Sequence, residues 1–70
     1  MATIVRRDGF RVMIFTNDHE PPHVHVFKAG AEAVIELWPL AIRENYGMSR
    51  ANLRRAVDLV AENQPMLMEA

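Results

Sequence analysis

The sequence predicts an α+β fold, in which a small antiparallel sheet of three to four strands carries one C-terminal amphipathic helix packed on one face. Two observations lead to this fold class. Short stretches rich in β-branched and aromatic residues, separated by turn dipeptides, fill the first half of the chain, whereas apolar residues recur at helical spacing near its end. A length of 70 residues leaves room for a single small domain, residues 1–70.

The first two strands are expected over residues 3–6 and 10–15. Between them lies Asp8-Gly9, a dipeptide that supplies the positive φ angles of a tight hairpin. Residues 16–22 are mostly polar and end in two prolines, so this segment is expected to form a loop. The first strands therefore pair as a hairpin, and a longer connection follows them.

Two further strands are expected over residues 23–28 and 31–37, joined by a turn at Ala29-Gly30. In the first of these, the two valines face one way and both histidines face the other, because side chains alternate along a strand. In the second, three apolar side chains share one face and two glutamates share the opposite one. A helix on one face leaves the other face partly open, which is a place for the histidines.

The remaining elements follow a break at Trp38-Pro39. The pattern of residues 40–45 is ambiguous, with a helical turn as its interpretation, and residues 46–48 are expected to form a linker. Ser49 is a good N-cap for an amphipathic helix over about residues 50–63. Pro65 is expected to end this helix or to begin a second helical turn.

Composition narrows the class of function. A net charge of −1 does not support a dedicated nucleic-acid binder, since such domains are usually clearly basic. The absence of cysteine excludes disulfides and thiolate zinc sites. No apolar run approaches the roughly 20 residues that span a bilayer, and no long apolar leader stands at the N-terminus. The expectation is therefore a cytoplasmic protein without a membrane segment.

All three histidines lie within residues 19–25, and this is the main candidate for a functional site. On a strand, His23 and His25 share one face with Cα atoms about 6.5 Å apart, which suits two imidazoles reaching one divalent transition metal such as zinc. The preceding loop, with Glu20 as a further acid, offers a third ligand and leaves one position for water. The candidate metal ligands are His19, His23, His25 and Asp18.

Two other interpretations of the histidines stay open. In a small ribonuclease, His23 and His25 would act as general base and general acid, with Arg11 or Arg43 stabilising the developing charge. Alternatively, the two histidines are half-exposed strand residues with a structural role, or they contact a partner. The sequence does not complete a catalytic constellation.

Four apolar side chains are candidates for partner binding: Trp38, Met66, Leu67 and Met68. Trp38 is expected to fill the core or the sheet edge rather than to act as a binding hot spot. The Met-Leu-Met segment either packs back on the sheet or forms an exposed partner-binding tail, and methionine suits both uses because its side chain is adaptable. A small protein partner or a homo-oligomer would help so small a domain to be stable.

Most of the chain resembles a known family. The segment that carries the resemblance begins with Gly-Phe-Arg at residues 9–11 and an apolar strand, continues with Asn17-Asp18, and reaches Glu-Pro-Pro-His-Val-His-Val at residues 20–26. It resembles the bacterial domain-of-unknown-function family four-one-six-zero. The resemblance implies a short bacterial or phage-associated protein, a component of a toxin–antitoxin-like pair with another small protein. It implies no catalytic residue; His23 and His25 match the family motif, whereas His19 lies at a looser position.

Overall fold

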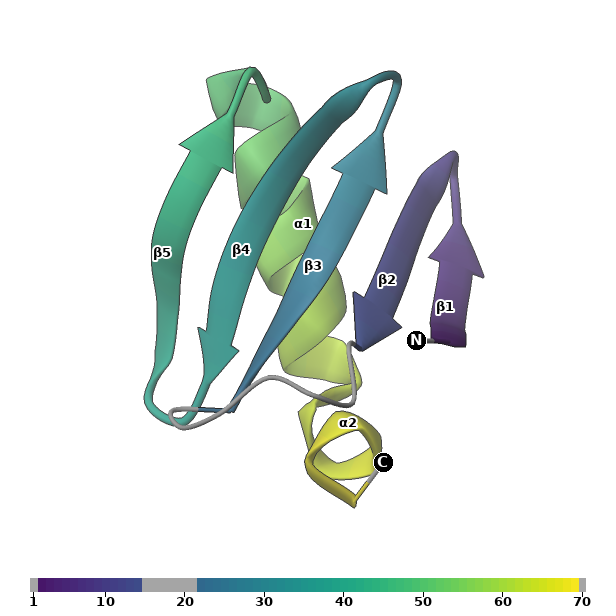
Figure 1. Cartoon of the computed structure of the whole chain (residues 1–70), viewed down its shortest axis with the longest axis vertical. Helices are drawn as coiled ribbons and strands as arrows, with labels where there is room; N and C mark the ends of the chain where they lie inside the picture. The colour runs from purple at the N-terminus through teal and green to yellow at the C-terminus, as the bar shows by residue number, and fades with distance from the viewer. Residues whose placement is uncertain (1, 15–21, 70) are drawn as a thin grey trace.

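The computed structural model describes residues 2–14 and 22–69. Their elements are β1 (Ala2–Arg7), β2 (Phe10–Ile14), β3 (His23–Lys28), β4 (Ala31–Leu37), β5 (Leu40–Tyr46), α1 (Arg50–Glu62) and α2 (Gln64–Glu69). The five strands form one antiparallel sheet in the order β1-β2-β3-β4-β5, and α1 crosses one face of it (Figure 1). The α+β class and the C-terminal helix are confirmed, but the sheet has five strands rather than three to four.

The additional strand is β5, in the segment that the sequence predicted as a helical turn. Leu40 pairs with Leu37, and Ile42 pairs with Ile35, so two apolar side chains alternate as a strand requires. A bulge then shifts the register beside Val34, which interrupts the alternation. The prediction failed because β5 lies at the sheet edge, where polar helix-forming residues are tolerated in a strand.

The hairpin turns predicted at Asp8-Gly9 and at Ala29-Gly30 form as expected. Asp8 and Gly9 have φ angles of 51° and 83°, and Ala29 and Gly30 have φ angles of 50° and 83°. Positive φ at both central residues is the condition for a two-residue turn whose twist matches the flanking strands. The second turn fixes the register of β3 against β4, with Lys28 opposite Ala31. This register determines which side chains face one another at the site described below.

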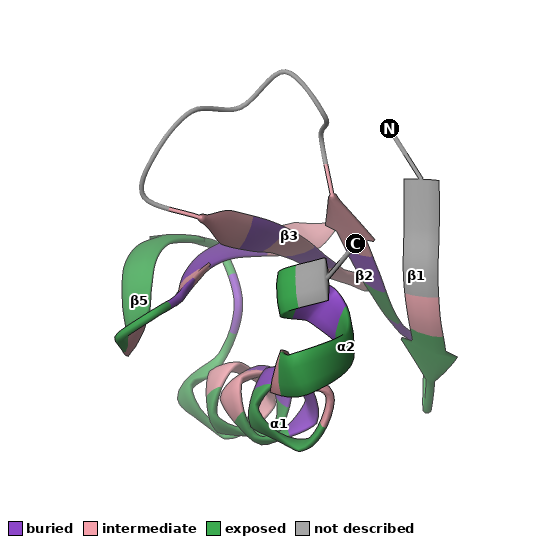
Figure 2. Cartoon of the chain, turned by 90° about the horizontal axis from the view of Figure 1, so that it is seen from below, coloured by how far each residue is buried: buried purple, intermediate pink, exposed green. Residues whose placement is uncertain are grey.

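The core lies between the sheet and the two helices. Val24, Val26 and Ile35 are fully buried on the sheet side, and Ala56 and Val60 are fully buried on α1. The apolar face predicted for β4 and most of the apolar face predicted for α1 are thereby confirmed. In Figure 2, β5 and the outer side of α1 are coloured as exposed.

The C-terminal segment forms a second helix rather than a tail. Asn63 ends α1, and the Gln64 side-chain amide donates a hydrogen bond to the Leu37 carbonyl oxygen. Leu67 is 2% exposed and belongs to the core, whereas Met66 and Met68 are about half exposed. Leu67 therefore packs back on the core, as the first alternative predicted, whereas partner binding by Met66 and Met68 stays a prediction. Within the described residues, no helix is both long enough and apolar enough to cross a membrane.

Candidate functional site

His23 and His25 lie on the sheet face opposite α1, as the alternation of β3 predicted. Both histidines are half-buried, while Val24 and Val26 between and beside them point into the core. The rings of His23 and His25 lie side by side, with centroids 5.3 Å apart and planes tilted by 59°. The other predicted metal ligands, His19 and Asp18, and the further acid Glu20 fall outside the described residues.

The His25 ring is oriented by a carboxylate on the next strand. Nδ1 of His25 lies 2.7 Å from Oε2 of Glu32, and the two side chains are only 17% and 30% exposed. Since an ionised carboxylate only accepts hydrogen bonds, Nδ1 donates this one. A neutral His25 ring is then held in the Nδ1–H tautomer, which places its lone pair on Nε2.

The His23 ring has a different neighbour. Nη1 of Arg43 donates to Nδ1 of His23 at 3.4 Å, while Nε of Arg43 donates to Oε2 of Glu36 at 3.1 Å. A guanidinium has no acceptor, so Nδ1 of His23 is the accepting nitrogen. Nδ1 therefore donates a hydrogen bond in His25 and accepts one in His23. Arg43 reaches this position from β5, next to the bulge.

Arg11 occupies the same sheet face but engages an aromatic ring. Its guanidinium carbon lies 5.6 Å from the centroid of Phe27, within the range of a cation–π interaction. Arg11 also pairs across strands with Arg6, which places a second guanidinium on this face. Arg43 is the arginine at hydrogen-bonding distance from an imidazole, whereas the sequence put Arg11 first.

The charges on this open face are balanced. The cross-strand register and the contacts of Arg43 assign three arginines and three glutamates to it: Arg6, Arg11, Arg43, Glu32, Glu36 and Glu44. A nucleic-acid footprint would instead carry a clear excess of positive charge. Among residues 2–14 and 22–69, no group of three or more histidine or acidic side chains is arranged to hold a metal ion. The two histidines alone do not make a metal centre.

A second surface runs along the β4–β5 hairpin. Trp38 in the turn is 70% exposed, Ile42 is 47% exposed and Tyr46 is 52% exposed. The expectation that Trp38 fills the core or the sheet edge is wrong, because the turn carries it beyond the last cross-strand pair, Leu37 with Leu40. Ile42 and Tyr46 were missed as candidate site residues, since residues 40–45 were predicted as a helical turn and residues 46–48 as a linker. The pairing of Ile42 with Ile35, had it been considered from the sequence, could have revealed that this segment is a strand.

Tyr46 is also coupled electrostatically to its neighbours. A hydrogen bond with the Glu44 carboxylate, followed by desolvation and by the negative charges of Glu44 and Glu32, raises the pKa of the Tyr46 hydroxyl above 10.0. The shift favours the neutral phenol because the phenolate would stand beside two carboxylates. Tyr46 therefore remains a hydrogen-bond donor on the exposed edge strand at physiological pH.

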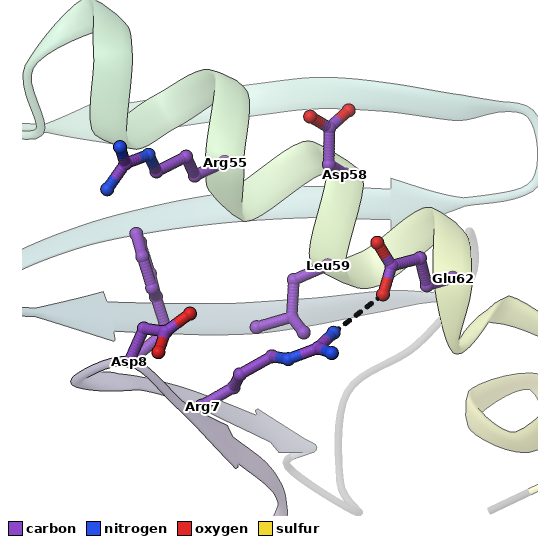
Figure 3. A pocket seen from close by; sticks show the side chains of 7 residues that line it. Arg7, Asp8, Arg55, Asp58, Leu59 and Glu62 are labelled. Atoms are coloured by element: carbon purple, nitrogen blue, oxygen red, sulfur yellow. Dashed lines mark hydrogen bonds and ion pairs between the residues drawn. The ribbon is translucent and has the colours of Figure 1, made fainter.

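A third feature is a pocket of about 340 Å³ between the β1–β2 hairpin and α1 (Figure 3). Its apolar floor includes Phe10 and Leu59. At its rim, Nη1 of Arg7 lies 2.7 Å from Oε1 of Glu62, an exposed ion pair that joins β1 to α1. Arg55 also lines this pocket. The pocket lies on the helix side of the sheet and contains neither histidine.

Fold and site together define a two-layer α+β domain with a half-buried histidine pair on an open sheet face and an exposed apolar hairpin at the sheet edge. The sequence model of the domain of unknown function DUF4160 matches residues 9–70. The chain belongs to this family, so the resemblance drawn from the sequence is confirmed. No curated protein and no solved structure matches the chain.

Proposed function

We propose that this protein is an interaction module, a component of a toxin–antitoxin-like pair that acts through protein–protein contact. One observation carries the proposal: the β4–β5 hairpin exposes three large apolar side chains, with Trp38 in its turn, Ile42 on the helix side of β5 and Tyr46 on the opposite side. Several large apolar side chains exposed on one hairpin of a small domain favour an interaction surface at this edge of the sheet. β5 is also an edge strand, and its outer backbone groups have no partner strand within the described sheet.

The polar face supports the same choice. Among the described residues its arginines and glutamates are equal in number, and Arg43 is already engaged with Glu36. A catalytic site for a phosphodiester would need positive charge directed at the phosphate, whereas the arginine beside His23 is paired with a carboxylate. The domain is also small enough to gain stability from association with a small protein or with a second copy.

Co-expression with the products of the genes that flank this one tests the proposal. We expect the two chains to copurify as a stoichiometric complex, and we expect Ile42→Asp to abolish the complex while the circular dichroism spectrum stays unchanged. Ala61→Asp, an equally charged change at an exposed position of α1 away from the hairpin, is the matched control and should leave the complex intact. If the Ile42→Asp variant still copurifies with its partner, the partner binds elsewhere than at this surface. If no complex forms with the wild-type chain, the proposal is refuted.

A second candidate function rests on the histidine pair. The 2.7 Å contact from Glu32 fixes the His25 tautomer, which is how a general base or a metal-ligating histidine is commonly oriented. A small ribonuclease-like or zinc-dependent enzyme would lose RNA cleavage, or bound metal, in His25→Ala and more mildly in Glu32→Gln. The interaction module predicts that neither substitution changes RNA cleavage or metal content, measured by gel assay and elemental mass spectrometry.

A further inference from the structure

We propose that the groove between β5 and α1 binds a short acidic segment of the partner protein, anchored by an aliphatic side chain. The inference rests on the proposed function and names the site and the chemistry of the partner. The groove has a volume of about 370 Å³. It is lined by Ile42 from β5 and by Leu53, Val57, Arg50, Arg54 and Asp58 from α1.

The floor of the groove is apolar and incompletely covered. Ile42 is 47% exposed, and Leu53 and Val57 are half-buried at the margin of the core. These three side chains come from two elements, so the floor is preformed by the packing of α1 against the sheet. An aliphatic side chain placed on this floor would remove apolar surface from water at about 25 cal/mol per Å².

The rim at the start of α1 is positively charged and uncompensated. Arg50 and Arg54 are exposed, and neither forms a salt bridge within the part of the chain that the structure describes. The first turn of α1 also contains no acidic residue, so nothing offsets the partial positive charge of the helix N-terminus. By contrast, Arg7 and Arg43 both have carboxylate partners. A carboxylate from a partner is the group that this end of the groove lacks.

The opposite end of the groove has the opposite sign. Asp58 lies there, one helical turn beyond Arg54, and would repel an acidic residue. The bound segment is therefore oriented: its acidic residues lie toward Arg50 and Arg54, and its aliphatic anchor lies over Leu53 and Val57. A second copy of this chain is a poorer occupant, because a two-fold interface could pair Asp58 with one arginine of each groove but would leave the other arginine without a carboxylate.

Selection from a phage-displayed library of short random peptides tests the inference. We expect peptides with an aliphatic residue near two or more Asp or Glu residues to be enriched on the wild-type chain. Arg54→Glu should weaken binding of a synthetic enriched peptide by at least about tenfold. Arg55→Glu, the same charge reversal one residue along α1, is the matched control and should leave binding within about twofold, because Arg55 lines the other pocket.

Each remaining outcome overturns the inference. If the enriched peptides contain no acidic residues, charge complementarity does not guide binding. The same conclusion follows if the Arg54→Glu and Arg55→Glu variants bind the peptide equally well. A dimer in light scattering that Arg54→Glu alters would make a second copy the occupant. No enriched peptide at all would refute the groove as a docking site. None of these results decides the proposed function, which the co-expression experiment tests separately through the presence or absence of a stoichiometric complex of the wild-type chain.

Discussion

Leu67→Ala tests whether α2 is part of the folded domain or an appendage that serves only partner binding. Leu67 is 2% exposed and contributes to the core between sheet and helices, although its neighbours Met66 and Met68 are 46% and 47% exposed. Truncating a buried leucine to alanine costs about 2–5 kcal/mol of unfolding free energy. Because α2 is short and lies at the periphery, its packing can partly collapse, so we expect a loss of about 2–3 kcal/mol.

The loss is large relative to the stability of the domain. A chain of 70 residues has an unfolding free energy of roughly 4–10 kcal/mol at 0.05–0.15 kcal/mol per residue. For a domain of this size, each 1 kcal/mol lowers Tm by about 4–8 °C. Leu67→Ala is therefore expected to lower Tm by roughly 10–20 °C, and Met66→Ala and Met68→Ala by much less, at about 1 kcal/mol or under.

Thermal and urea unfolding followed by circular dichroism measure all three variants under the same conditions. The two methionine variants are matched controls, since they remove side chains of similar size from the same short helix. If Leu67→Ala unfolds at the same urea concentration as Met68→Ala, α2 does not dock as described and the C-terminal part of the core is wrong.

Three further predictions concern the sheet. A long-range proton–nitrogen NMR correlation spectrum should show neutral His25 as the Nδ1–H tautomer, and Glu32→Ala should shift it toward a mixture; an unchanged spectrum would contradict the hydrogen bond. The single tyrosine, Tyr46, should titrate by ultraviolet absorbance above 10.0 in the wild type and closer to 10.0 in Glu44→Gln, since the Glu44 carboxylate favours the neutral phenol. Gly30→Ala should lower the free energy of unfolding, measured with urea, by about 1 kcal/mol. The cost comes from the φ of +83° alone, because an added Cβ meets no atom within 4 Å, and an unchanged free energy of unfolding would argue against the positive φ.

The strands around the histidines could be predicted because local and tertiary signals agree there. Alternation along β3 separates the valines from the histidines, and the Ala29-Gly30 turn places Lys28 opposite Ala31. Counting back from that pair puts His25 opposite Val34, with Glu32 on the diagonal. The contact between His25 and Glu32 could thus be predicted from the sequence, although none of the interpretations of the histidines used it.

The edge of the molecule was harder to predict. β5 mixes two core-facing apolar residues with a bulge and a polar run, so its local sequence resembles a helical turn. Glu62 of α1 contacts Arg7 of β1, a tertiary contact that no spacing within the helix reveals. The β5–α1 groove depends on both elements at once, and it could not be predicted while β5 was missing.

Hydrogen–deuterium exchange of the backbone amides, measured for the chain alone and in complex with its co-expressed partner, tests the central claim most directly. The proposed interaction module predicts slower exchange in the complex at residues 41–46 of β5 and residues 50–57 of α1, which border the groove. Unchanged exchange in both segments, with protection confined to the β1–β2 hairpin or absent, would contradict the account.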